Sequence, residues 1–240
     1  MAVTTLGTVT FPTHTNELKY QITASKKISK ATLKSGTVLA KLVFSTCKLD
    51  LSYRVEQSDV LKTDLLAFRA ANLTTGFTFT DAGGYAHTNC QFDGGIDFKP
   101  TKQDNEKAGN PALWDVSFSL FWDDFAESDT VPISDVIKVV YKGGNESAKV
   151  PMVSGKNIAG TRKTWIKGPK YDERGFSMDF VKCQIPQEIV QYWTAKLGTE
   201  MTIDFPQIGL FTGLVNSSKF SLTKKAGDVW SSNSLVIREN

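Results

Sequence analysis

Acid–base chemistry in this sequence would have to use one of its two histidines, His14 or His87. A histidine beside a carboxylate can activate a hydroxyl group or a water molecule, so a hydrolase that uses His87 with Asp81 is one hypothesis. However, neither histidine has a Ser or Cys neighbour in a nucleophile motif. The sequence also has no GxSxG, HExxH or phosphate-binding glycine loop. We therefore expect the protein not to be an enzyme, and we predict no catalytic residue.

The cysteines give little support for metal chemistry. Cys47, Cys90 and Cys183 lie far apart, and no CxxC or Cys/His spacing assembles a zinc site. Their odd number argues against a disulfide framework, so we expect small, buried, reduced thiols and synthesis in a cytoplasm. We predict no cofactor and no bound metal.

Charged residues are unevenly distributed along the chain. Four carboxylates gather in the middle, at Asp123, Asp124, Glu127 and Asp129, without the spacing of an EF-hand. Lysines crowd the first fifth of the chain, namely Lys19, Lys26, Lys27, Lys30, Lys34, Lys41 and Lys48. Two interpretations remain open: solvated arms with a solvated linker, and complementary docking between subunits.

Tryptophans offer a second binding hypothesis, because their rings can stack on sugars as in a lectin. Trp114, Trp193 and Trp230 fall on apolar faces of expected elements, where core packing explains them. Trp165 lies in a basic segment instead. The alternative function is therefore a carbohydrate-binding adhesion module, of a phage or a bacterial surface, that uses Trp165.

The elements that must position these residues are mostly strands. Apolar and polar residues alternate at residues 8–11, 18–23 and 38–51, and most regularly at 114–121. Residues 26–36 lack apolar periodicity and are rich in Lys, Ser and Thr. They predict an exposed loop or the tip of an extended hairpin.

Two short helices are expected among the strands. Ser58 is a plausible N-cap, and Leu61, Leu65 and Phe68 follow at helical spacing, with the end near Asn72. Pro186 suits the first turn of the second helix, which carries the apolar residues Ile189, Trp193 and Leu197 and stops at Gly198. In both helices the apolar stripe predicts a face that packs on the core.

The order of these elements repeats along the chain. In each half a strand with a cysteine, Cys47 or Cys183, is followed by a helix, a Lys-Ala-Gly sequence and a strand led by Trp114 or Trp230. The polar, basic segment 154–175 takes the place of residues 26–36. The sequence therefore predicts two tandem domains, residues 1–130 and 131–240, each large enough to bury its own core.

Composition is that of a folded protein. The 240 residues include 40% hydrophobic and 22% charged residues, and the net charge of +3 is too small to indicate nucleic-acid binding by itself. No signal peptide is recognisable at the start, and no apolar run approaches the roughly 20 residues of a membrane span.

From Phe176 onward the chain resembles the bacteriophage lambda minor tail protein M family, small domains of siphophage tail tips. The resemblance covers residues 175–239 and depends on a strand, a helix with Trp193 and Leu197, the segment 203–206, Phe220 and a last strand at 235–237. The first half, with the sequence Phe-Thr-Phe-Thr-Asp-Ala-Gly-Gly at 77–84, is similar to tail-tube and distal-tail domains.

The resemblance implies a mainly β (α+β) fold of two tandem tail-tube-like domains, each a β-sandwich or split barrel with one short flanking helix. It implies a structural protein of the virion, made in the host cytoplasm and placed at the tail tube or the baseplate tube near the tip. The expected partners are further copies of the chain, as a homotrimer that forms a pseudo-six-fold ring, and other tail-tube, distal-tail and hub proteins. DNA would pass through the lumen without sequence-specific binding. No membrane insertion by the protein is expected.

In such a ring the basic arms, residues 26–36 and 154–174, would be hairpins between subunits or between rings, a use of strand edges that a closed ring makes safe. The implied contact residues are Lys26, Lys27, Lys30, Lys34, Lys163, Trp165 and Lys167.

Overall fold

The computed structural model describes residues 3–12, 15–32, 38–101, 112–132, 138–142, 146–149, 152–156, 162–166, 171–205, 209–225 and 229–239. The strands of the first half are β1 (Thr5–Leu6), β2 (Val9–Thr10), β3 (Asn16–Thr32), β4 (Val38–Glu56), β5 (Phe77–Thr80), β6 (Ala86–Pro100) and β7 (Leu113–Trp122). Those of the second half are β8 (Lys138–Lys142), β9 (Glu146–Lys149), β10 (Met152–Lys156), β11 (Arg162–Ile166), β12 (Tyr171–Val181), β13 (Glu200–Phe205), β14 (Gly209–Val215), β15 (Lys219–Lys224), β16 (Val229–Ser232) and β17 (Leu235–Arg238). The helices are α1 (Asp59–Ala71) and α2 (Pro186–Lys196), so the predicted mainly β class is confirmed.

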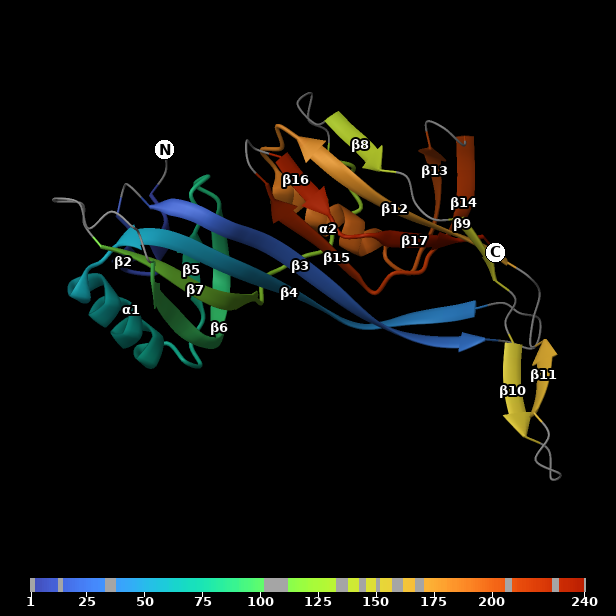
Figure 1. The fold of residues 1–240 in the computed structure, drawn as a ribbon, viewed down its shortest axis with the longest axis horizontal. Helices are drawn as coiled ribbons and strands as arrows, with labels where there is room; N and C mark the ends of the chain where they lie inside the picture. The colour runs from blue at the N-terminus through green and yellow to red at the C-terminus, as the bar shows by residue number, and fades with distance from the viewer. Residues whose placement is uncertain are drawn as a thin grey trace.

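One sheet runs through both halves of the chain. Its order is β13-β14-β17-β12-β16-β15-β3-β4-β7-β6-β5-β1-β2, with β8 and β9 also paired to β12. The halves meet where β15 pairs with β3, in a register that places Leu222 opposite Ile22. Figure 1 shows the result: an elongated molecule with α1 and β2 at one end and the separate hairpin β10–β11 at the other.

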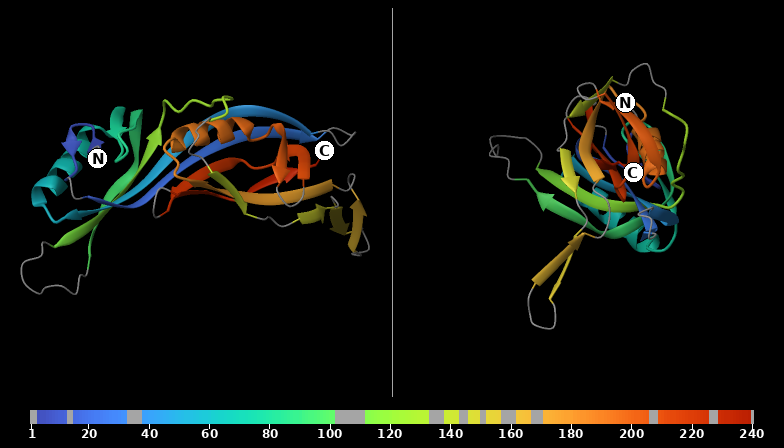
Figure 2. Two further views of the ribbon diagram at one scale, coloured as in Figure 1. Left: turned by 90° about the horizontal axis from the view of Figure 1, so that it is seen from above. Right: turned by 90° about the vertical axis from the view of Figure 1, so that its right-hand side faces the viewer.

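The longest elements are β3 and β4, which form a hairpin along the molecule. Their pairing extends from Asn16 opposite Arg54 to Thr32 opposite Val38, with register shifts at two places. Viewed from above, the two strands pass alongside α2 (Figure 2). Of the two expectations for residues 26–36, the extended hairpin is therefore confirmed as far as Thr32. Residues 33–37 lie outside the described residues.

Local signals set both helices as expected. The Ser58 side chain accepts a hydrogen bond from the Leu61 N–H at 3.2 Å, and α1 ends at the C-cap Asn72. Pro186 stands in the first turn of α2, and Gly198 follows its end with φ of 76°. Neither described helix is long and apolar enough to cross a membrane.

Burial departs from the expectation of two separate cores. The buried apolar residues form one continuous cluster that contains Leu6 and Ile22 from the first half together with Trp193, Phe220 and Ile237 from the second. Since the halves share a sheet and a core, they stabilise each other. The boundary between residues 130 and 131 stays a prediction.

The repeat of elements holds in order but not in detail. A strand, a helix and further strands follow one another in β4-α1-β5 and again in β12-α2-β13. The equivalence of Cys47 and Cys183 was wrong, because Cys47 lies in the middle of β4 whereas Cys183 comes after β12 has ended. The Lys-Ala-Gly landmarks at 107–109 and 225–227 lie wholly or partly outside the described residues.

The three cysteines are free, and they are buried as expected. Burial raises the pKa of the Cys183 thiol to about 11 and that of Cys90 to about 12. Because the thiolate is the reactive form, these groups are inert in the folded chain.

Glycines 94 and 95 lie inside β6. The register between β6 and β7 shifts between Phe92 and Ile96, and Gly94 has φ of 97°. The pair therefore forms a bulge that bends the strand rather than a turn that ends it.

Candidate functional site

The acidic segment after β7 folds back onto the second half of the chain. The Glu127 carboxylate accepts a hydrogen bond from the Lys26 ammonium at 2.7 Å, and Asp129 accepts one from Lys196 at 2.8 Å. The Ser128 N–H donates to the Gln191 carbonyl in α2 at 3.3 Å. We call residues 123–132 the strap. Within the chain, Glu127 and Asp129 of the strap bind lysines, while Asp123 and Asp124 are exposed, as in a solvated linker.

Lys26 joins three parts of the molecule. It comes from β3, binds the strap through Glu127, and approaches the carbonyls of Thr194 and Ala195 at 3.4 Å each. These carbonyls belong to the last turn of α2, where a positive charge is favoured. The Thr194 carbonyl also accepts a hydrogen bond from the Leu197 N–H at 3.2 Å. Lys26 is only 8% exposed, and its charge is used within the chain. The prediction that Lys26 contacts another subunit is therefore corrected.

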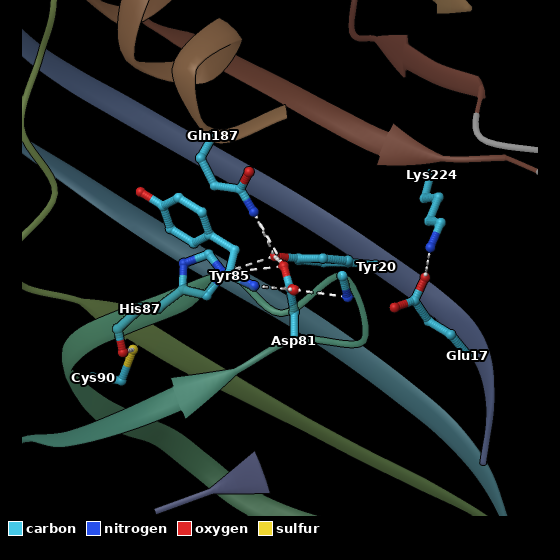
Figure 3. A network of polar contacts seen from close by, with 9 residues as sticks. Glu17, Tyr20, Asp81, Tyr85, His87, Cys90, Gln187 and Lys224 are labelled. Carbon is cyan, nitrogen blue, oxygen red and sulfur yellow. Dashed lines mark hydrogen bonds and ion pairs between the residues drawn. The ribbon is translucent and has the colours of Figure 1, made fainter. Parts of the chain in front are cut away.

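A second polar cluster lies where β3, the turn after β5, β6 and α2 meet (Figure 3). The Tyr20 hydroxyl donates to Asp81 Oδ2 and lies at 2.9 Å from both that oxygen and His87 Nε2. The Gln187 amide donates to Asp81 Oδ2 at 3.1 Å. We call Tyr20, Asp81, His87 and Gln187 the central network. All four side chains are buried, with His87 fully so.

Asp81 is the acceptor at the centre of this network. Its Oδ1 receives the N–H groups of Gly83 and Tyr85 at 2.9 Å each, which forms the turn between β5 and β6. Burial alone would raise the pKa of Asp81, but the neighbouring His87 ring and the hydrogen bonds from Tyr85 and Tyr20 lower it below its ordinary value. The carboxylate is therefore ionised at neutral pH. Burial and the Asp81 charge together raise the pKa of Tyr20 well above its ordinary value, so its hydroxyl keeps the proton.

The two ring nitrogens of His87 have different surroundings. Its Nδ1 has no hydrogen-bond partner among the described residues, while Nε2 faces the Tyr20 hydroxyl. Leaving a lone pair without a partner costs less than burying an unpaired N–H donor, so we assign the proton to Nε2. The ring is enclosed by Phe79, stacked at 5.6 Å, and Trp122, edge-on at 4.7 Å.

This geometry bears on the hydrolase hypothesis. His87 Nε2 and Asp81 Oδ2 are brought to 3.5 Å, as that hypothesis requires. A substrate cannot touch them, however, because the exposed fraction is 0% for His87 and 3% for Asp81. The arrangement instead fixes α2 of the second half to β3 and β6 of the first. His14 lies outside the described residues. Among the residues described, no group of three or more His, Cys, Asp or Glu side chains is placed to hold a metal ion.

The other contact candidates fall into three groups. Lys27 is exposed on β3, whereas Lys30 is described only through its backbone pairing with Ala40. Lys163 and Trp165 belong to β11, where their backbones pair with Gly155 and Val153. Lys34 and Lys167 lie outside the described residues.

Sequence reasoning missed Tyr20 and Gln187. A tyrosine in an alternating strand and a glutamine in the first turn of a helix carry no motif, and they come together only because the two halves share a sheet. One signal was available: Asp81 is followed by Ala-Gly-Gly, which is typical of a carboxylate that accepts backbone N–H groups in a turn. Compared with known proteins, the chain matches no family model and none of the curated proteins.

Proposed function

We propose that the chain is a structural component of a bacteriophage tail, in the tail tube or the baseplate tube near its tip. Three copies form a pseudo-six-fold ring around the DNA channel, and each half of the chain serves as one tube-like β-sandwich or split barrel. The neighbours of the ring are other tail-tube, distal-tail and hub proteins, and its location is the virion.

The long hairpin is the observation that carries this proposal. Residues 28–32 of β3 and 38–47 of β4 have only each other as strand partners among the described residues, since β15 reaches no further than Ser25 and β7 no further than Lys48. A two-stranded ribbon in water is marginally stable by itself. Its extension past the sheet is therefore explained if a neighbouring subunit packs against it or extends the sheet across the interface.

The polar face of the first half suits a surface along which DNA moves. Neighbouring strands β4 and β7 join their side chains there through pairs such as Ser52 with Ser117 at 2.9 Å and Arg54 with Asp115 at 2.8 Å. Lys48 binds Asp93 at 2.7 Å in the same region. Because the cations are paired with carboxylates, this face has no surplus of positive charge to hold phosphate groups, and a strand of DNA would slide past it.

Native mass is the first test of the proposal. Purified chain should run as a trimer of the 26.4 kDa subunit, or as a multiple of that trimer, in size-exclusion chromatography with light scattering. A twofold or fourfold particle, or a monomer at every concentration measured, would contradict it.

A further inference from the structure

An open groove of about 1140 Å³ lies between α1 and the first two strands. One wall comes from α1 and the other from the start of the chain. Two apolar side chains in its lining are exposed to an unusual degree, Val60 at 70% and Val3 at 38%. We call it the α1 groove. Because it is wide open to solvent rather than enclosed, it suits a chain segment better than a compact ligand.

The wall opposite α1 includes the last strand of the sheet. β2 ends the sheet order and has β1 as its strand partner. Residues 8–12, which contain β2, all line the groove. The edge of a sheet presents backbone N–H and C=O groups to which an extended segment can add as a further strand. The occupant is therefore expected to contain β-structure.

The charge of the groove indicates what kind of segment it accepts. The two basic residues of α1 are engaged elsewhere: Lys62 lies over the ring of Trp114, and Arg69 donates to the Gly94 carbonyl at 2.8 Å. The charged residue that lines the groove is Asp64, and Asp59 is exposed in the first turn of the same helix. The groove is thus apolar with an acidic side, and it favours an apolar segment with positive charges.

The hairpin β10–β11 has these properties. Its described residues include Val153, Trp165 and Ile166 near one end and Lys156, Arg162 and Lys163 near the other, and they contain no carboxylate. It forms a two-stranded sheet of its own. Figures 1 and 2 place it at the end of the molecule opposite α1, so it cannot reach the groove of its own chain.

We propose that the α1 groove of one copy receives the β10–β11 hairpin of the next copy, a contact that rests on the self-assembly proposed above. The two surfaces differ and lie at opposite ends, so the contact is head to tail. A head-to-tail contact joins successive subunits into a closed ring when the rotation closes, and into a stack or filament when it does not.

Disulfide trapping tests this contact in the full-length chain. Ala67→Cys, in the lining of the groove, is combined in turn with Ser154→Cys, Gly155→Cys and Thr164→Cys on the hairpin, since a disulfide needs Cα atoms within about 7 Å and these changes keep the charges of both surfaces. At least one pair should give a ladder of covalent dimers, trimers and larger species under mild oxidation. Each single variant should stay largely monomeric on a denaturing gel, and the buried native thiols do not interfere.

A charge placed in the groove gives a second measurement. Val60→Arg should weaken self-association at least about tenfold, because the new guanidinium offsets the charge of Asp64, four residues further along α1, and repels a basic hairpin. Leu73→Arg is the matched control, since Leu73 is also exposed, at 54%, but does not line the groove. Self-association of that variant should stay unchanged.

The outcomes separate the two proposals. The groove contact would be overturned, and the proposed ring would still stand, if the particles assemble normally but no cysteine pair gives a covalent ladder and the Val60→Arg variant self-associates as the wild type does. A chain that remains monomeric before any substitution would overturn both.

Discussion

Replacing Lys26 with methionine should lower the free energy of unfolding by about 3 kcal/mol, because it leaves the Glu127 carboxylate without its buried partner. The ammonium lies 2.7 Å from Glu127 and 3.4 Å from two carbonyls at the end of α2. Methionine keeps most of the volume of the side chain, so the change isolates the loss of the charge and its hydrogen bonds. The strap and the last turn of α2 should both loosen.

Chemical denaturation of the purified chain measures this effect. Lys196→Met is the matched control: it breaks the other ion pair of the strap, to Asp129, but that carboxylate is 84% exposed and water replaces the lost partner. Its loss of stability should therefore be much smaller. Equal losses for the two variants would mean that Lys26 does not join the strap to α2 in the way described.

The second large effect is expected at Asp81. Asp81→Ala should lower the free energy of unfolding by about 4 kcal/mol, because four donors lose their acceptor at once and buried donors without partners are costly. These donors are the N–H groups of Gly83 and Tyr85, the Tyr20 hydroxyl and the Gln187 amide. Asp81→Asn keeps an oxygen for the two backbone groups, so it should cost less. Thermal or denaturant unfolding would rank the stabilities of the wild type, Asp81→Asn and Asp81→Ala.

The pH dependence follows from the lowered pKa of Asp81. Its carboxylate binds a proton less readily in the folded chain than in the unfolded chain, whose ordinary value is 3.8. The stability it contributes is complete above about pH 4 and is lost as the pH falls through the lower, folded pKa. Stability of the wild type should therefore drop more steeply below pH 4 than that of Asp81→Asn. Parallel profiles would show that Asp81 is not ionised in the folded chain.

Local features of the fold could be predicted from the sequence. The N-cap Ser58, the stripe of Leu61 and Leu65, and the stop at Gly198 depend on residues close together in the chain, and the structure has them as expected. The alternation in residues 114–121 likewise predicted β7, whose apolar residues Trp114 to Leu120 are buried.

Features that depend on distant residues could not be predicted in the same way. A lysine in a Lys- and Ser-rich segment is typical of an exposed arm, and nothing near Lys26 reveals that Glu127 and the end of α2 will meet it. The sequence did suggest His87 with Asp81 as a pair. It could not show that the pair is sealed from solvent, because the residues that complete the network, Tyr20 and Gln187, come from different halves of a shared sheet.

The Cys47 comparison illustrates the same limit. Matching short sequences suggested equivalent positions in two copies, but the strand that contains Cys47 continues to Glu56 because β7 pairs with it over that length. Strand ends are set by partners elsewhere in the sheet. A repeated order of elements is therefore a sounder inference from this sequence than a repeated register.

Electron micrographs of the purified chain, or of the tail that contains it, test the central claim most directly. If three copies form a pseudo-six-fold ring, averaged end-on views should show rings with three-fold symmetry and six similar lobes around a central channel. Isolated monomers, or rings whose lobes do not number two for each subunit, would contradict the proposed function.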